Sequence, residues 1–232
     1  MRPEPHPPAQ VSGVPAFDEV AEFVSADAAH GRFDDWGRST VIDENTGAAV
    51  IDEDLFARLH AIAGIPARFP VGSAGLIHVY GYWFSTVLTP YGYKRDRWQD
   101  GGLATTLGQP PHAFRLWGDE HSTPLQRVTA VALPLLAEPP VSVRGRADAA
   151  VDGVPTRVVL AGPEHDRAPG SAARSGATAL IYGARTAGAW RLITVFPMSG
   201  DPEAVVADYR ADVRWRWNAA PPQAPSPAVH PK

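Results

Sequence analysis

The chain of 232 residues contains no cysteine, and this absence excludes several kinds of site. Without thiols there is no disulfide, no thiolate nucleophile and no cysteine-ligated zinc or iron–sulfur centre, and the redox compartment stays open. No apolar run reaches the roughly 18 to 20 residues that a membrane span needs, and residues 1–8 lack the apolar core of a signal peptide. We therefore expect no membrane partner, and the cytoplasm is the simplest location.

Lysine is nearly missing as well. Of 21 lysines and arginines, only Lys94 and Lys232 are lysine. This scarcity is informative because an amine can lose its proton and attack a carbonyl group, whereas guanidinium stays charged. Arg95 and Arg97 place like charge beside Lys94, and Trp98 can exclude water from it; both effects lower the pKa of an amine. Lys94 is therefore a candidate reactive group, and an ordinary surface cation is the competing interpretation.

Charge and composition bound the organisation of the chain. A net charge of -4 provides no general attraction to nucleic acid, so we expect any anion site to be local and nucleic acid not to be a partner. Proline-rich composition predicts disordered tails at residues 1–14 and 219–232. Residues 15–218 are then a single domain. The sequence gives no indication of the oligomeric state.

Helical periodicity predicts three helices. The first starts near residue 15, and the second follows the acidic residues 52–54 and ends at Gly64. The third is capped by Asp201 and has a stripe of apolar side chains that extends to Trp217. Residues 76–85 are apolar or aromatic on both faces and predict a buried central strand, and residues 125–134 predict another strand. Turn signals at residues 152–153 and 187–188 predict hairpins over 141–162 and 177–198, separated by a flexible loop at 164–176.

These elements predict an α+β fold. The sheet is expected to be a curved antiparallel sheet of about six strands, with two N-terminal helices and a C-terminal helix packed on it. Alternating crossover helices are missing from the second half of the chain, so a parallel nucleotide-binding sheet is not expected. A turn at residues 89–92 is expected to separate the aromatic segment from Lys94.

The aromatic segment and the cations after it form the candidate site. In a strand, His78, Tyr80 and Tyr82 would share one face and could line a cavity of the curved sheet, although a satisfied core histidine is the alternative for His78. We expect Lys94, His78 and Tyr82 to be catalytic. The expected substrate-binding residues are Tyr80, Arg95, Arg97, Trp98, His112, Arg115 and His121.

Common cofactor motifs are absent. The glycine patterns of dinucleotide sites and phosphate loops do not occur. Ser73 resembles a hydrolase nucleophile only superficially, because Val71 stands where that motif has its first glycine. His112 and His121 are the histidines closest to a metal-binding arrangement, but their spacing does not match one. We therefore predict neither a metal nor an organic cofactor.

Three hypotheses about function remain. The first is a cofactor-independent enzyme of lyase, decarboxylase, isomerase or cyclase type that acts on a small anionic carboxylate or carbonyl compound. In it Lys94 is the amine or cation, His78 the acid/base, Tyr82 a hydrogen-bond donor and Arg95 the anion-binding group. The second is a non-catalytic binding or scaffold protein with an aromatic core. The third is a metal-independent ribonuclease that uses His78, His112 or His121.

Overall fold

The computed structural model describes residues 14–140, 143–162 and 177–222. Its helices are α1 (Phe17–Ala29), α2 (Glu53–Ala63), α3 (Asp96–Gln99), α4 (Gly102–Thr106), α5 (Pro124–Ala137) and α6 (Pro202–Ala211), together with the 3-10 helices η1 (Arg32–Asp35) and η3 (Gly81–Phe84) and the π-helix η2 (Leu76–Tyr80). Its strands are β1 (Arg38–Thr40), β2 (Val71–Ser73), β3 (Leu88–Thr89), β4 (Gly92–Tyr93), β5 (Gly145–Val151), β6 (Val154–Ala161), β7 (Thr178–Thr186) and β8 (Ala189–Met198).

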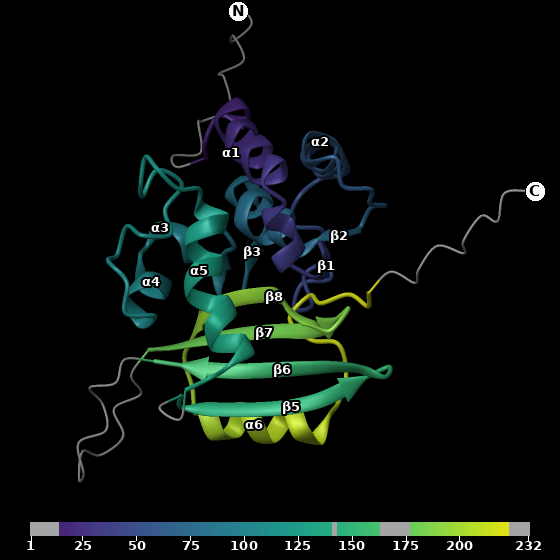
Figure 1. Cartoon of the computed structure of the whole chain (residues 1–232), viewed down its shortest axis with the longest axis vertical. Helices are drawn as coiled ribbons and strands as arrows, with labels where there is room; N and C mark the ends of the chain where they lie inside the picture. The colour runs from purple at the N-terminus through teal and green to yellow at the C-terminus, as the bar shows by residue number, and fades with distance from the viewer. Residues whose placement is uncertain (1–13, 141–142, 163–176, 223–232) are drawn as a thin grey trace, which may run out of the picture.

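The main sheet is antiparallel and has the strand order β5-β6-β7-β8. Figure 1 shows it beneath the helical part of the chain, with β8 next to that part and β5 at the far edge. The remaining strands form two separate two-stranded ribbons, β1–β2 and β3–β4. The α+β class is confirmed, but the prediction of one curved sheet of about six strands is wrong.

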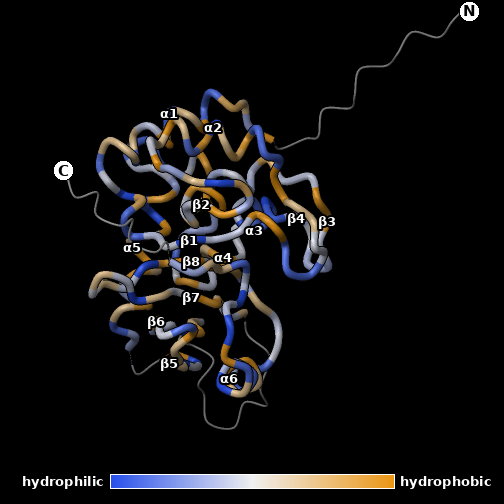
Figure 2. The backbone as a smooth tube through the Cα atoms, turned by 90° about the vertical axis from the view of Figure 1, so that its right-hand side faces the viewer, coloured by the Kyte–Doolittle hydropathy of each residue, from blue (hydrophilic) through white to orange (hydrophobic). Residues whose placement is uncertain are grey.

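Helices cover both faces of the main sheet. α5 contacts β6, β7 and β8, whereas α6 contacts β5 from the opposite side (Figure 2). The crossing of α5 is close at Gly183, where an added Cβ would lie 2.3 Å from Leu136 Cδ2 and 2.4 Å from the Arg191 carbonyl oxygen. Glycine is required there because any side chain would displace the helix or the neighbouring strand.

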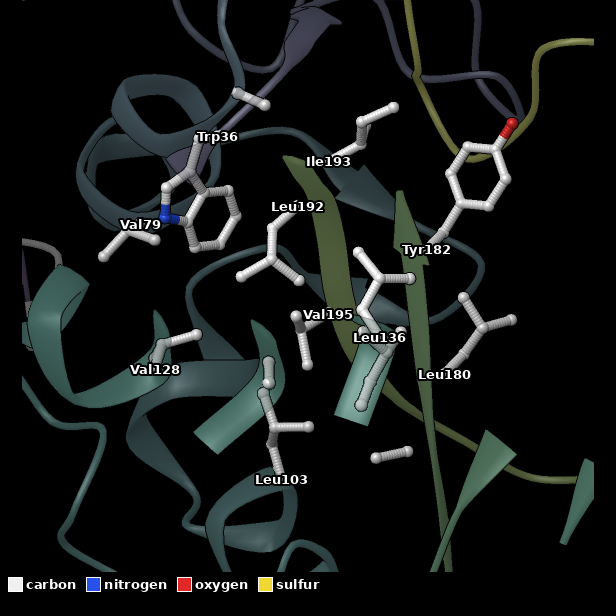
Figure 3. Packing of buried hydrophobic residues seen from close by; sticks show 14 of the residues in the cluster. Trp36, Val79, Leu103, Val128, Leu136, Leu180, Tyr182, Leu192, Ile193 and Val195 are labelled. Carbon is white, nitrogen blue, oxygen red and sulfur yellow. The ribbon is translucent and has the colours of Figure 1, made fainter. Parts of the chain in front are cut away.

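The principal core lies between the sheet and the helical part. Figure 3 shows Trp36, Val128 of α5 and Leu192 of β8 directed into the same interior, and all three belong to one buried cluster. A smaller cluster around Phe56 of α2 includes Ile77 and Tyr82. The aromatic segment therefore belongs to two cores, which fixes it from both sides.

Several sequence predictions are confirmed. Asp52 caps α2 by accepting a hydrogen bond from the Leu55 backbone N–H at 2.7 Å, and Gly64 ends that helix with a left-handed φ of 65°. Asp201 caps α6 in the same way. The two predicted hairpins form, with Val151 opposite Val154 at the first turn and Thr186 opposite Ala189 at the second.

The predicted central strand at residues 76–85 is wrong. The segment forms η2 followed directly by η3, and both Gly75 and Gly81 have right-handed helical backbone angles. An apolar run buried on all sides carries no period that distinguishes a strand from a helix. The helical turn has a direct consequence for the site, because His78, Tyr80 and Tyr82 no longer alternate onto one face.

The predicted strand at residues 125–134 is also wrong, since this stretch lies within α5. Thr123 accepts a hydrogen bond from the Gln126 backbone N–H at 3.1 Å, and Pro124 occupies the first turn. Leu125, Val128 and Ala132 are buried at helical spacing. The sequence carries this cap and this spacing, but its loose alternation up to Pro134 indicated a strand instead. Pro134 lies inside the last turn of the helix.

The two ends of the predicted domain also differ in detail. α6 ends at Ala211, so Trp217 lies beyond the helix whose stripe was expected to include it. Ala219 bridges to Ser39, and the Ala220 N–H donates to the Arg38 carbonyl oxygen at 3.1 Å, so the packed chain continues past residue 218. The predicted loop at 164–176 and most of both predicted tails lie outside the described residues.

Candidate functional site

The switch from π-helix to 3-10 helix brings His78 against Tyr82. The two rings stack with centroids 4.7 Å apart and planes 18° from parallel. His78 is 1% exposed and Tyr82 is also 1% exposed, so the pair lies within the protein. π-helical turns widen the spacing of side chains and occur frequently at functional sites.

A hydrogen-bond network fixes the protonation of His78. The Ser39 hydroxyl donates to the Asn218 carbonyl oxygen at 2.7 Å, and Ser39 Oγ itself lies 2.7 Å from His78 Nε2. Because a hydroxyl has one proton, the network assigns the imidazole proton to Nε2, which donates it to Ser39. His78 Nδ1 has no hydrogen-bond partner among the described residues. It is therefore a buried, unprotonated acceptor.

Charge and burial both keep this imidazole neutral. Burial, followed by the positive charges of Arg97 and Lys94, holds the pKa of His78 well below its ordinary value. Burial also raises the pKa of Tyr82 to about 12, although the Arg97 charge and a hydrogen bond from Asn218 oppose the rise. Asn218 Nδ2 donates to the Tyr82 hydroxyl at 3.2 Å. Both rings are thus uncharged at neutral pH.

Lys94 also lies near Tyr82 and is ion-paired with Asp43 Oδ2. The Lys94 side chain is 12% exposed and that of Asp43 is 0% exposed. Lys94 Nζ is 5.8 Å from the centroid of the Tyr82 ring. The amine is therefore held near a buried carboxylate and an aromatic ring, with little exposure to solvent.

The pKa values of both ionic partners are lowered. Burial and then the Arg97 charge lower the pKa of Lys94, against the opposing effect of Asp43. Burial would raise the pKa of Asp43, but the Lys94 ammonium and the backbone N–H groups of Asn45 and Thr46 together lower it. The carboxylate thus keeps its charge, while the amine holds its proton less tightly than an exposed lysine does.

Arg97 is the second cation of the cluster. Its guanidinium carbon is 5.1 Å from the Tyr82 ring centroid and 5.6 Å from that of Phe196. The group donates to the Val195 carbonyl oxygen at 3.3 Å and to the Thr194 hydroxyl at 3.4 Å. Within the described part of the chain it is paired with no carboxylate, so its charge is not neutralised by direct contact.

Three other candidates from the same segment face elsewhere or support the site indirectly. The Trp98 indole N–H donates to the His78 carbonyl oxygen at 2.9 Å and so anchors the π-helix. Arg95 donates to the Ser85 carbonyl oxygen and stacks over Tyr93, with 4.4 Å to the ring centroid. Tyr80 faces away from the cluster.

Tyr80 belongs to a different buried network. Its hydroxyl donates to Asp27 Oδ2, and the Thr123 hydroxyl donates to Asp27 Oδ1 at 2.6 Å. Arg32 Nη1 contacts the same carboxylate at 2.9 Å. This network joins α1, η1, η2 and the start of α5, which makes it a structural link between helices.

The histidine-rich loop is not joined to the cluster. His112, Arg115 and His121 are exposed, and Arg115 Nε donates to the Gln99 carbonyl oxygen at 3.1 Å. Arg127 holds this loop by donating to several of its carbonyl oxygens, among them that of Ala113 at 2.6 Å. No contact in the described ranges connects these residues with His78, so the histidines needed for a ribonuclease are not gathered.

Sequence reasoning missed three members of the cluster, namely Ser39, Asp43 and Asn218. Asp43 shortly precedes Asn45-Thr46-Gly47, a sequence that is typical of a turn. Asn218 was placed at the edge of an expected tail, yet it is 7% exposed. The sequence signal that could have pointed to Asp43 was a polar residue next to a turn, at a position expected to be buried.

The surroundings of the cluster limit its chemistry. Three pockets are lined by described residues other than His78, Tyr82, Lys94 and Arg97. Among all described residues, no group of three or more His, Asp or Glu side chains could hold a metal ion, and no helix is long and apolar enough to span a membrane. The described cluster brings together an amine, a neutral imidazole, a phenol and a guanidinium, of which the amine of Lys94 retains some exposure to solvent.

Comparison with known protein families, curated proteins and solved structures finds no match to this chain. The site has to be interpreted from its own geometry.

Proposed function

We propose that the chain is a cofactor-independent enzyme that acts on a small anionic carbonyl or carboxylate compound, with Lys94 as its reactive amine. The observation that carries the proposal is the environment of Lys94, which is ion-paired with the buried Asp43 and lies close to Arg97. A lowered pKa increases the fraction of the amine that is free to attack a carbonyl carbon. Perturbed titratable groups that contact one another are typical of active sites.

The chemistry follows from the amine. The Lys94 ammonium releases a proton to solvent, which its lowered pKa favours, and the Nζ lone pair attacks the carbonyl carbon of the substrate. The carbonyl oxygen takes up the displaced electron pair and protons, leaves as water, and a cationic imine forms. This imine can accept the electrons released when a carboxylate or a proton leaves the neighbouring carbon, which is the step shared by decarboxylases, lyases and isomerases.

Arg97 suits the anionic part of the substrate better than Arg95 does. Arg97 contacts Tyr82 and carries a charge that no described carboxylate neutralises directly. Arg95 instead donates to the Ser85 carbonyl oxygen and covers Tyr93. A guanidinium in a site of low dielectric constant binds a carboxylate strongly, and here it would orient the carbonyl group toward Lys94.

His78 and Tyr82 supply the neutral groups of the proposed mechanism. The unpartnered His78 Nδ1 can accept a hydrogen bond or a proton, and the Tyr82 hydroxyl, with its pKa near 12, remains a donor at neutral pH. The two rings stack and are fixed by Ser39 and Asn218. Such fixed groups lower the reorganisation that a transition state requires.

Reductive trapping tests the proposal directly. The protein is incubated with sodium borohydride and a panel of 2-oxo acids and aldehydes, and peptides are analysed by mass spectrometry. We expect one adduct on Lys94 that disappears in Lys94→Arg and persists in the matched control Lys232→Arg. Because these are the two lysines of the chain, the peptide map is unambiguous. Labelling of Lys232 or the N-terminal amine alone, across the panel, would refute the amine mechanism.

A non-catalytic binding protein is the second candidate, and one observation favours it. Ser39, His78 and Asn218 satisfy most of one another's hydrogen-bonding groups, as structural polar networks do. In that case Lys94→Arg and His78→Gln change only the stability of the protein. A carbonyl compound that is turned over by the wild type and not by folded Lys94→Arg decides for the enzyme.

A further inference from the structure

A cavity of about 420 Å³ opens beside the β1–β2 ribbon. Its walls come from η1, the β1–β2 ribbon, the ends of β7 and β8 that meet at their hairpin, and the segment after α6. Figure 1 shows that last segment returning from α6 along the sheet to the β1–β2 ribbon. The volume lies in the range of small-molecule sites, and none of the cluster residues lines it.

Trp215 gives the cavity a flat apolar wall, whereas Trp36, which also lines it, is 5% exposed and its ring is directed into the core. Trp36 donates its ring N–H to the Thr129 hydroxyl at 2.8 Å, and Trp215 donates its ring N–H to Asp152 Oδ2 at 2.8 Å. Neither acceptor lines the cavity. The polar edge of each indole is therefore engaged elsewhere, and the partly exposed Trp215 ring is held in place for a planar ligand.

The cavity also holds one cation without a carboxylate partner. The Arg38 guanidinium makes a single hydrogen bond within the described residues, from Nη1 to the Pro221 carbonyl oxygen at 3.3 Å. Arg191, by contrast, donates to the Asp34 carbonyl oxygen and lies 3.9 Å from Asp35 Oδ1. Asp34 lines the same cavity. The charged residues of the lining are therefore Arg38, Arg191 and Asp34, and Arg38 is the cation whose guanidinium keeps most of its donors free of described partners.

We propose that this cavity binds a small aromatic carboxylate. The flat apolar body would lie against the Trp215 ring, and the carboxylate would receive two parallel hydrogen bonds from the Arg38 guanidinium, a geometry that arginine is shaped to provide. One unneutralised guanidinium matches a monoanion better than a dianionic phosphate. The inference goes beyond the proposed lysine chemistry and does not depend on it, since the cavity and the cluster share no side chain.

Binding of 2-naphthoate, measured by titration calorimetry on the full chain, tests this site. We expect saturable 1:1 binding at least about tenfold tighter than that of 2-naphthylmethanol, which has a similar shape and no charge, because a charge-assisted hydrogen bond contributes roughly 1.5 to 3 kcal/mol. Arg38→Gln should weaken the binding of 2-naphthoate by about tenfold or more and leave the affinity for 2-naphthylmethanol within about twofold of the wild-type value. Arg38→Lys, which keeps the charge without the fork, should give an intermediate value.

Arg214→Gln is the matched control, because Arg214 is exposed and pairs with Asp212 outside the cavity. It removes the same charge and should leave both affinities within about twofold. Equal affinities for the acid and the alcohol, no saturable binding of 2-naphthoate, or equal effects of Arg38→Gln and Arg214→Gln would each overturn the proposal. Tighter binding of 2-naphthyl phosphate than of 2-naphthoate would overturn the assignment to a carboxylate. Thermal melts establish that each variant is folded.

Discussion

Asp43→Asn removes the buried charge beside Lys94 while keeping the shape and the oxygen that accepts from the Asn45 and Thr46 backbone N–H groups. Breaking a buried ion pair from one side costs roughly 3 to 5 kcal/mol. Because the Lys94 side chain retains 12% exposure, we expect the lower end of this range, about 3 kcal/mol. In a domain of this size that loss lowers Tm by about 6 to 12 °C.

A double-mutant cycle separates the ion pair from the turn. Urea unfolding is followed for the wild type, Asp43→Asn, Lys94→Met and the double variant at pH 7. In the Lys94→Met background Asp43 is a buried carboxylate without its cation, so Asp43→Asn should cost nothing there or stabilise the protein. The coupling between the two positions is then about 3 kcal/mol, in keeping with the single substitution.

The same cycle can refute the reasoning. A cost for Asp43→Asn that is equal in the two backgrounds would mean that the carboxylate acts through the turn alone. A cost below about 1 kcal/mol in the wild-type background would mean that the pair behaves as an exposed surface pair.

Two further predictions concern the histidines and the sheet. The depressed pKa of buried His78 means that the unfolded chain takes up a proton near pH 6.5 while the folded chain does not, so the free energy of unfolding should fall below that pH by up to about 1.4 kcal/mol per pH unit. His78→Gln should remove the contribution of His78 to this pH dependence and leave that of His60, because burial also lowers the pKa of His60. A pH dependence that is unchanged in His78→Gln would contradict the assignment to His78. Gly183→Ala should lower the free energy of unfolding in urea by about 2 to 3 kcal/mol, because the added methyl group overpacks against Leu136. Gly102→Ala is the control: an added Cβ there has its nearest contact at 3.4 Å, so the loss should be less than about 1 kcal/mol. Equal losses for the two variants would show that the sheet can yield at Gly183.

Local signals in the sequence predicted those elements whose ends are marked. Asp52 and Gly64 identify α2, and the glycine turns at Gly153 and Gly188 identify the two long hairpins. In each case a short side chain or a residue with positive φ satisfies the backbone at a defined place. These features act within a few residues and can be recognised without knowledge of the fold.

The segment of His78 could not be assigned in this way, because its environment is buried on every side. Its π-helical turn is selected by contacts with distant residues, such as the Trp98 indole on the His78 carbonyl oxygen and Ser39 on the ring. The approach of Lys94 and Arg97 to Tyr82 was anticipated from sequence proximity. Asp43 and Asn218 join them only through the fold, and no local pattern connects positions so far apart.

The most direct test of the account is the pKa of Lys94 itself. With ¹³Cε-labelled lysine the chain gives two side-chain signals, from Lys94 and Lys232, and Lys94→Arg assigns them. Burial and the Arg97 charge predict that Lys94 titrates clearly below 10.5, that Arg97→Gln raises its pKa, and that Asp43→Asn lowers it further. A Lys94 signal that titrates together with Lys232, or that does not respond to Arg97→Gln, would contradict the claim that this cluster prepares a reactive amine.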